Sequence, residues 1–233
     1  MGSLIVTHPV AGVAHNQLLP ASDFIETHYL LEEDMKLLLD NLSDDTNIKA
    51  IIISGTFDIG IRLSAKLRHT LVALENWPKA VISIISGKCS LLGLALVLSC
   101  DVRIAVTDAL FSINNTNTSM AQESNFIRNL LKASNNTSWA QKVILGGQSF
   151  DAEEALNRGV VSNICNQPGR AFDMALNLGI SISTKDVAEV ENTKRALLLA
   201  RDSNYVLQAA KARYTDEDAL SDLQQTLGIK SRL

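Results

Sequence analysis

Short apolar runs and amphipathic segments alternate along the first two thirds of this chain. Residues 50–54 and 80–85 are apolar at almost every position, which is typical of strands whose two faces are both covered by helices. Residues 30–42 instead place leucines and Met35 at helical spacing, with acidic residues between them, which predicts an amphipathic helix. The pattern therefore predicts an α/β protein.

The rest of the chain continues with alternating elements and then becomes mostly helical. Gly55 and Gly87 are expected to end the two apolar strands, and the polar segment 114–119 is expected to be a loop. Further strands are predicted at 4–6, 102–105, 110–113 and 160–164, and helices at 64–76, 91–98, 123–133, 138–145, 152–157 and from 170 onward. No linker rich in proline, glycine or serine divides these segments.

Composition excludes several classes of protein. The chain has 233 residues, 46% hydrophobic and 20% charged, as in a soluble globular protein rather than a disordered one. A net charge of −4 argues against a nucleic-acid binder. The longest apolar run, 90–99, is too short to span a bilayer. Cys89, Cys100 and Cys165 form neither a disulfide framework nor a metal-ligand pattern, so we expect no metal site and a reducing compartment.

Several segments carry a family resemblance through their order and spacing. The strongest match is 98–105, Leu-Ser-Cys-Asp-Val-Arg-Ile-Ala. The others lie at 51–63, 78–87, 144–161 and 193–197. Together they resemble the enoyl-CoA hydratase/isomerase (crotonase) family, closest to its Δ3,Δ2-enoyl-CoA isomerase branch.

The resemblance implies a fold and an assembly. The fold is a crotonase-like spiral of ββα units over 1–165, followed by a helical C-terminal region over 166–233. This helical region, which contains Leu197, Leu198, Leu199 and Val206, would pack on the core and on neighbouring subunits in a homotrimer or a dimer of trimers.

The resemblance also implies an acyl-CoA thioester as substrate, with no cofactor held by the chain. In the family, the thioester oxygen sits between two backbone N–H groups that stabilise an enolate. The matching positions here are Ile61, after Gly60, and Leu92. The second position departs from the family, because Leu91-Leu92 replaces two glycines and the leucine side chain must turn away from the thioester.

The acidic residues that the resemblance would supply are mostly absent. The two glutamates of hydratases correspond here to Ala95 and Asn115, so hydration is not expected. The catalytic glutamate of the isomerase branch corresponds to Glu123. One carboxylate is enough for an isomerase that takes a proton from C2 and returns it to C4. The expected function is therefore an isomerase that shifts a double bond in an unsaturated fatty acyl-CoA.

Other interpretations remain open. Ser119 and Gln122 form a capping-box pattern, so Glu123 could serve only the first turn of a helix. The chain could bind acyl thioesters without catalysis, or act as a decarboxylase or dehydratase on a carrier-bound thioester, because the segment 64–78 that walls the acyl pocket is short. The last residues, Ser231-Arg232-Leu233, match a peroxisomal address. We therefore expect a peroxisomal location in a eukaryote and a cytoplasmic one otherwise.

Overall fold

The computed structural model describes residues 4–18, 35–37, 39–42, 45–59, 65–113 and 124–213. By its contacts the chain divides into two compact units, Met1–Val190 and Glu191–Leu233. The first unit contains the whole sheet and the helices that cover it. The second contains most of helix α8 (Val187–Arg213). The organisation into 1–165 and 166–233 stays a prediction, and we note that the first unit runs on through α7 (Pro168–Ser183).

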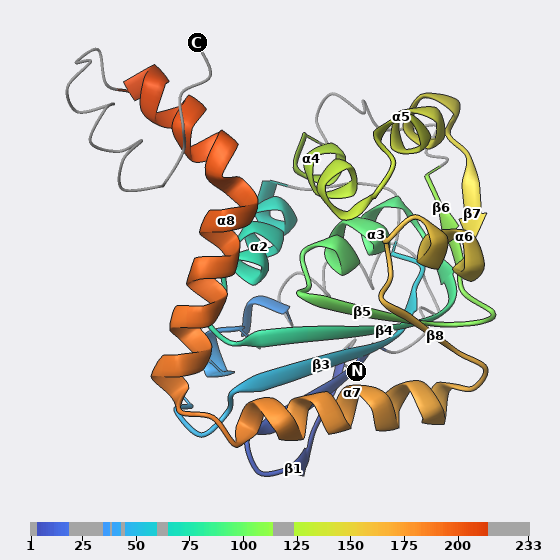
Figure 1. Cartoon of the computed structure of the whole chain (residues 1–233). Coiled ribbons are helices and arrows are strands. Elements are labelled where there is room, and N and C mark those ends of the chain that lie inside the picture. The colour runs from blue at the N-terminus through green and yellow to red at the C-terminus, as the bar shows by residue number, and fades with distance from the viewer. Residues whose placement is uncertain are drawn as a thin grey trace. The chain divides into compact units, whose positions relative to one another are not determined.

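A single mixed sheet forms the centre of the first unit (Figure 1). Its main path runs through β1 (Leu4–Val10), β2 (Val13–Leu18), β3 (Ala50–Phe57), β4 (Ala80–Cys89), β5 (Val102–Val106) and β8 (Asn163–Cys165). β1 is antiparallel to β2, and the other neighbours on this path are parallel. β6 (Leu110–Ser112) pairs with the end of β4 and with β7 (Ser149–Asp151).

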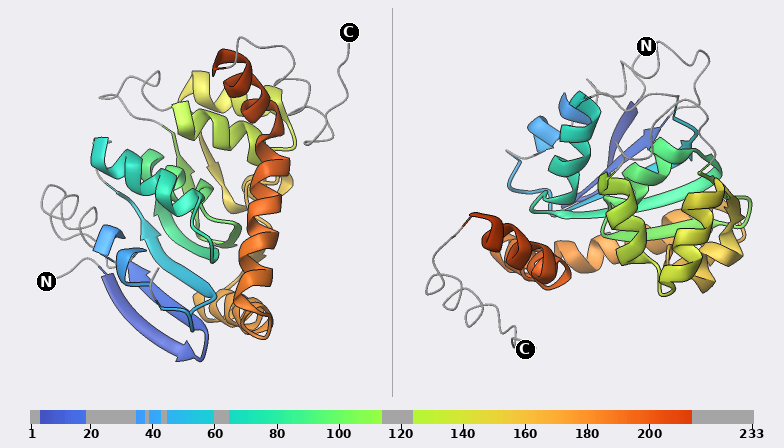
Figure 2. Two further views of the ribbon diagram at one scale, coloured as in Figure 1. Left: turned by 90° about the vertical axis from the view of Figure 1, so that its left-hand side faces the viewer. Right: turned by 90° about the horizontal axis from the view of Figure 1, so that it is seen from above.

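Helices cover both faces of the sheet, which explains its continuous apolar strands. α7 lies along one face, and α2 (Ala65–Glu75), α3 (Leu91–Leu98), α4 (Ser124–Ala133), α5 (Thr137–Gly146) and α6 (Ala152–Asn157) lie on the other side (Figure 2). In β3, Ile51 and Ile53 belong to the larger core, whereas Ala50 and Ile52 belong to the core beneath α7. Successive side chains of a strand point to opposite faces, so both sets must be apolar.

The prediction that the two apolar strands end at Gly55 and Gly87 was wrong. β3 continues past Gly55 to Phe57, and β4 continues past Gly87 to Cys89. Gly55 has φ +136°, and the β3–β4 register shifts between Gly55 and the Phe57–Cys89 pair. Here glycine allows the strand to bulge and continue, which brings the end of β3 to the start of α3.

The predicted loop at 114–119 and the first part of the predicted helix 30–42 lie outside the described residues. Where the structure describes the chain, the other elements agree with the pattern except at three places. α3 has the predicted bounds, 91–98. β2 and β7 were not predicted, because their segments are short and contain polar residues. The strand predicted at 160–164 begins only at Asn163, because the N–H groups of Val160 and Val161 donate to the carbonyl of Ala155 at the end of α6. Within the described residues, no helix is long and apolar enough to cross a membrane.

Candidate active site

The first turn of α3 meets the end of β3 at Ser90. Ser90 is the N-cap of α3, with φ −73° and ψ 174°, and its Oγ accepts a hydrogen bond from the Gly93 N–H at 3.4 Å. Serine is favoured at this position because its side chain satisfies an amide that has no partner within the helix. A serine directly before an apolar helical run was the sequence signal for this residue, and our interpretation of the sequence missed it.

Ser90 also contacts the segment that leaves β3. Its Oγ donates to the Ile59 carbonyl at 2.7 Å and accepts from the Ile59 N–H at 3.0 Å. The Ser90 N–H donates to the Phe57 carbonyl at 3.0 Å. The Oγ also donates to the Phe57 carbonyl at the longer distance of 3.3 Å. Residues 57–59 are therefore attached to the N-terminus of α3 by four hydrogen bonds to one residue.

Gly93 allows this close approach. A Cβ atom at position 93 would lie 1.8 Å from the Phe57 carbonyl oxygen and 2.7 Å from Phe57 Cβ. The neighbouring Leu92 is 2% exposed, and its side chain lies in the larger core. Of the three glycines usual in the family here, only the third is sterically required by the backbone of this chain.

The N–H of Leu92 is positioned as a donor. It belongs to the first turn of α3, where amides have no acceptor within the helix. The Ser90 hydroxyl takes the N–H of Gly93, and the Ser90 carbonyl takes that of Leu94 at 2.7 Å. The helix dipole adds positive potential at this end. Among the described residues, the Leu92 N–H is thus an amide of a helix N-terminus whose neighbouring amides, those of Gly93 and Leu94, both donate to Ser90.

The other predicted site residues are only partly described. Ala95 is buried in the larger core and carries no acid/base group. Ile61, Gly60, Asn115 and Glu123 lie outside the described residues. Helix α4 begins at Ser124, the residue after Glu123 in the sequence.

A buried ion pair anchors α4 to α2. Arg128 Nη2 donates to both carboxylate oxygens of Glu75, at 2.8 and 3.0 Å, and Asn129 Nδ2 lies 3.4 Å from Oε2. The Glu75 side chain is only 4% exposed. This pair therefore fixes the helix that follows Glu123.

Cys89 lies next to Ser90 but is not a nucleophile. Burial raises the pKa of its thiol well above the ordinary value, and the nearby Asp58 carboxylate raises it further. The thiol therefore stays protonated at neutral pH, and the prediction of an inert core thiol is confirmed for Cys89. Asp58, in the segment 57–59, is a described carboxylate close to this site that the sequence interpretation did not consider.

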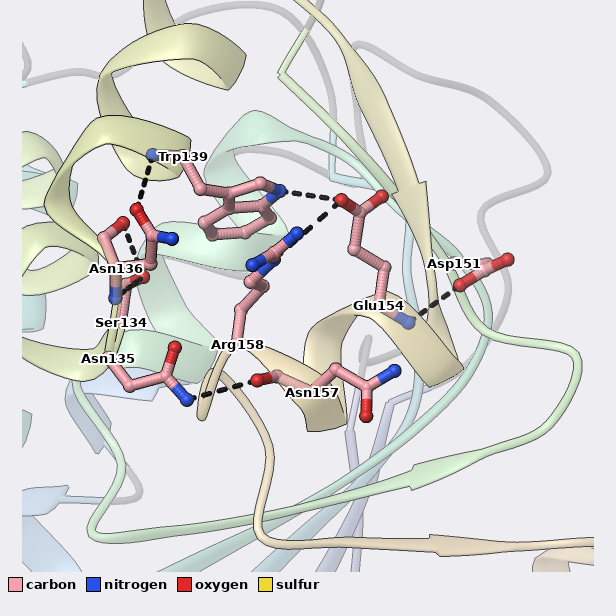
Figure 3. A network of polar contacts seen from close by, with 8 residues as sticks. All are labelled: Ser134, Asn135, Asn136, Trp139, Asp151, Glu154, Asn157 and Arg158. Carbon is pink, nitrogen blue, oxygen red and sulfur yellow. Dashed lines mark hydrogen bonds and ion pairs between the residues drawn. The ribbon is translucent and has the colours of Figure 1, made fainter.

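The matched segments farther along the chain have structural roles. Asp101 Oδ2 accepts from the Val81 N–H at 2.8 Å and so holds the turn between α3 and β5 to β4, which confirms the structural role predicted for it. In α5 and α6 (Figure 3), Trp139 Nε1 donates to Glu154 Oε1 at 2.7 Å, and Arg158 lies over the Trp139 ring. Asn136 and Asp151 cap these two helices. Among the described residues, no group of three histidines, cysteines or carboxylates gathers as metal ligands would.

Comparison with known proteins agrees with this geometry. Residues 61–232 match the enoyl-CoA hydratase/isomerase family. The human mitochondrial protein named Delta(3,5)-Delta(2,4)-dienoyl-CoA isomerase is 28% identical over 96% of this chain and 79% of its own length. The Arabidopsis thaliana peroxisomal protein of the same name is 26% identical over 58% of this chain and 49% of its own length. The crystal structure of a monofunctional enoyl-CoA isomerase from M. smegmatis superposes with a TM-score of 0.75 at 26% identity, over 87% of this chain and 95% of that one.

The chain belongs to the enoyl-CoA hydratase/isomerase family. It has the crotonase fold and groups with the isomerases of that family, as the order of its matched sequence segments predicted. It is accordingly an enzyme of a family that acts on acyl-CoA thioesters.

Proposed function

We propose that this chain is a 3-enoyl-CoA isomerase that moves the double bond into conjugation with the thioester carbonyl. The observation that carries the proposal is the Leu92 N–H, which Ser90 and Gly93 hold at the N-terminus of α3 beside the end of β3. In the proposal, this N–H and that of Ile61 bind the thioester oxygen. Two such donors stabilise the enolate oxygen, and loss of one typically costs about 10²–10³ in rate.

Glu123 is proposed to move the proton. Its carboxylate takes the C2 proton, and the C2–H electron pair passes into the enolate, with its negative charge on the oxygen held by the two N–H groups. The new carboxylic acid then returns the proton to C4, and the electrons of the former C3–C4 double bond form that C–H bond. The product is the 2-enoyl thioester, so neither an oxidant nor a water molecule is consumed.

The number of carboxylates favours a 3-enoyl substrate over the 3,5-dienoyl substrate that the relatives' names describe. C4 lies two bonds from C2, so a single carboxylate can reach both carbons. A 3,5-to-2,4 shift carries a proton to C6, four bonds from C2, which is beyond the hydrogen-bond reach of one fixed group. Ala95 and Asn115, the family's other acid/base positions, supply no second acid, and for the same reason we expect no appreciable hydration of crotonyl-CoA. A 3,5-to-2,4 shift would have to use another carboxylate, such as Asp58 beside Cys89, and the proposal assigns Asp58 no part in proton transfer.

The test is the turnover of 3-enoyl-CoA by the Glu123→Gln variant. The rate is measured from the increase in absorbance of the conjugated product. We expect kcat to fall by about 10²–10⁴ with little change in binding. The matched control is Glu153→Gln, since Glu153 is an exposed acid in the first turn of α6 and its substitution should leave turnover unchanged.

Other outcomes select the competing interpretations. A helix-capping Glu123 predicts full activity and a stability loss of about 1 kcal/mol or less. Wild-type protein that binds acyl-CoA but isomerises neither substrate would instead be an acyl-thioester binder. A faster reaction with 3,5-dienoyl-CoA than with 3-enoyl-CoA would show that a second acid exists at a position other than 95 and 115.

We further propose a homotrimeric assembly, or a dimer of trimers, in which apolar residues of α8 meet a neighbouring subunit. Leu197 and Leu199 are 66% and 44% exposed in the isolated chain, which supports this. Light scattering that gives a monomer at micromolar concentration would refute it. The relatives' names include both mitochondrial and peroxisomal proteins, and the peroxisomal location that Ser231-Arg232-Leu233 indicates in a eukaryote stays a prediction.

A further inference from the structure

Ser90 makes more contacts than a helix cap requires. A serine N-cap needs only the bond to an amide of the first turn, and here that bond, to the Gly93 N–H, is 3.4 Å long. The two bonds to Ile59, at 2.7 and 3.0 Å, are shorter and better formed. The hydroxyl is therefore bonded primarily to the chain that leaves β3, and only secondarily to its own helix.

These contacts join the two segments that carry the proposed donors. Ile59 lies two residues before Ile61, and Ser90 lies two residues before Leu92. Because Ser90 Oγ binds both the N–H and the carbonyl of Ile59, it fixes the peptide groups on both sides of this residue. The Ser90 N–H bond to Phe57 and the contact of Gly93 with the same carbonyl fix the helix against them.

We infer that Ser90 is a positioning residue that holds the first turn of α3, with the proposed donor Leu92, against the segment 57–59, which leads in sequence to the proposed donor Ile61. The inference rests on the proposed function, since it concerns the same site. Ser90 does not touch the thioester in this proposal and acts through the backbone of Ile59 and of the first turn of α3.

The test compares three substitutions. Ser90→Ala removes all four Oγ bonds. Ser90→Gly also removes them but keeps a residue that is well tolerated at an N-cap, so it separates the bridge to Ile59 from the stability of the helix. Ser90→Thr keeps the hydroxyl and should rescue function. Asn136→Ala is the matched control, because Asn136 caps α5 through the Trp139 N–H at 2.9 Å and, among the described residues, makes no hydrogen bond to Ser90, Leu92 or the segment 57–59.

Two measurements are made on each variant. The first is turnover of 3-enoyl-CoA, for which we expect Ser90→Ala and Ser90→Gly to lower kcat by about 10–100-fold with KM little changed. The second is the absorption spectrum of a bound conjugated 2,4-dienoyl-CoA. Two donors on the carbonyl oxygen polarise this chromophore and shift its absorption to longer wavelength. This red shift should shrink in the Ala and Gly variants and persist in Ser90→Thr and Asn136→Ala.

The two measurements separate the inference from the proposed function. A red shift that depends on Ser90 in a protein that isomerises nothing would support the positioning role and refute the isomerase. An active isomerase whose kcat and red shift are unchanged in Ser90→Ala and Ser90→Gly would refute the positioning role alone. Equal losses of activity in Ser90→Ala and Asn136→Ala would show that Ser90 acts only as a helix cap and would refute the positioning role. Wild-type protein that shows no red shift would refute both the positioning role and the proposed function.

Discussion

Substitution of Gly93 by alanine tests the contact between α3 and β3 most directly. The new Cβ atom would lie 1.8 Å from the Phe57 carbonyl oxygen, a backbone atom, and real Cβ contacts essentially never fall below 3.0 Å. The helix start and the strand end must therefore separate by about 1.2 Å, which is the difference between these two distances. A separation of that size breaks or stretches the bonds from Ser90 to Phe57 and Ile59.

The expected cost follows from three contributions. Overpacking of a well-packed site costs about 1–3 kcal/mol. Two weakened hydrogen bonds cost about 0.5–1.5 kcal/mol each. Alanine regains up to about 1 kcal/mol of helix propensity over glycine. We expect Gly93→Ala to lower the free energy of unfolding by about 3 kcal/mol, and the melting temperature by about 6–12 °C for a chain of this size.

The assay is urea unfolding followed by tryptophan fluorescence, together with turnover of 3-enoyl-CoA. Displacement of one donor by about 1 Å should lower kcat about 100-fold. Gly169→Ala is the control, because a Cβ at position 169 meets nothing within 4 Å and should be neutral or stabilising by less than about 1 kcal/mol. A Gly93→Ala protein as stable and as active as wild type would refute the close approach of α3 to Phe57.

Three further substitutions or reactions test other parts of the fold. Glu75→Ala leaves Arg128 without its carboxylate between α2 and α4, and urea unfolding should show a loss of about 3 kcal/mol; no loss would mean that the pair is dispensable. Burial lowers the pKa of His15 from its ordinary 6.5, so the unfolded chain takes up this proton first. Stability should therefore be full above about pH 6.5 and fall as the pH drops through the lower folded value. His15→Gln should flatten this fall in stability with decreasing pH, and an unchanged pH dependence of the melting temperature would contradict the role given to His15. The buried thiol of Cys89, whose pKa is raised, should resist iodoacetamide until the protein is denatured, and rapid native alkylation at this residue would contradict its burial.

Periodicity and local chemistry were enough to predict most of the elements. The apolar run 50–54 predicted a strand covered on both faces, and the apolar run 91–98 predicted a buried helix with its observed bounds, whereas the serine that caps this helix was missed. Both patterns reflect local rules, namely the alternation of side chains along a strand and the capping of free amides. The order of the matched segments then gave the family.

Other features depend on residues that are far apart in the sequence. Gly55 and Gly87 end strands by local preference, yet β3 and β4 continue because each supplies the other with backbone partners beyond the glycines. The short strand β7 exists only because β6 lies beside it. The site is also of this kind. The sequence shows that Gly93 is a glycine and Ser90 a serine, but the tertiary structure alone places the Phe57 carbonyl against one and the Ile59 backbone against the other. Local sequence therefore determined most of the helices and strands, whereas the contact of β3 with α3 at Ser90 and Gly93 was decided by packing across the sheet.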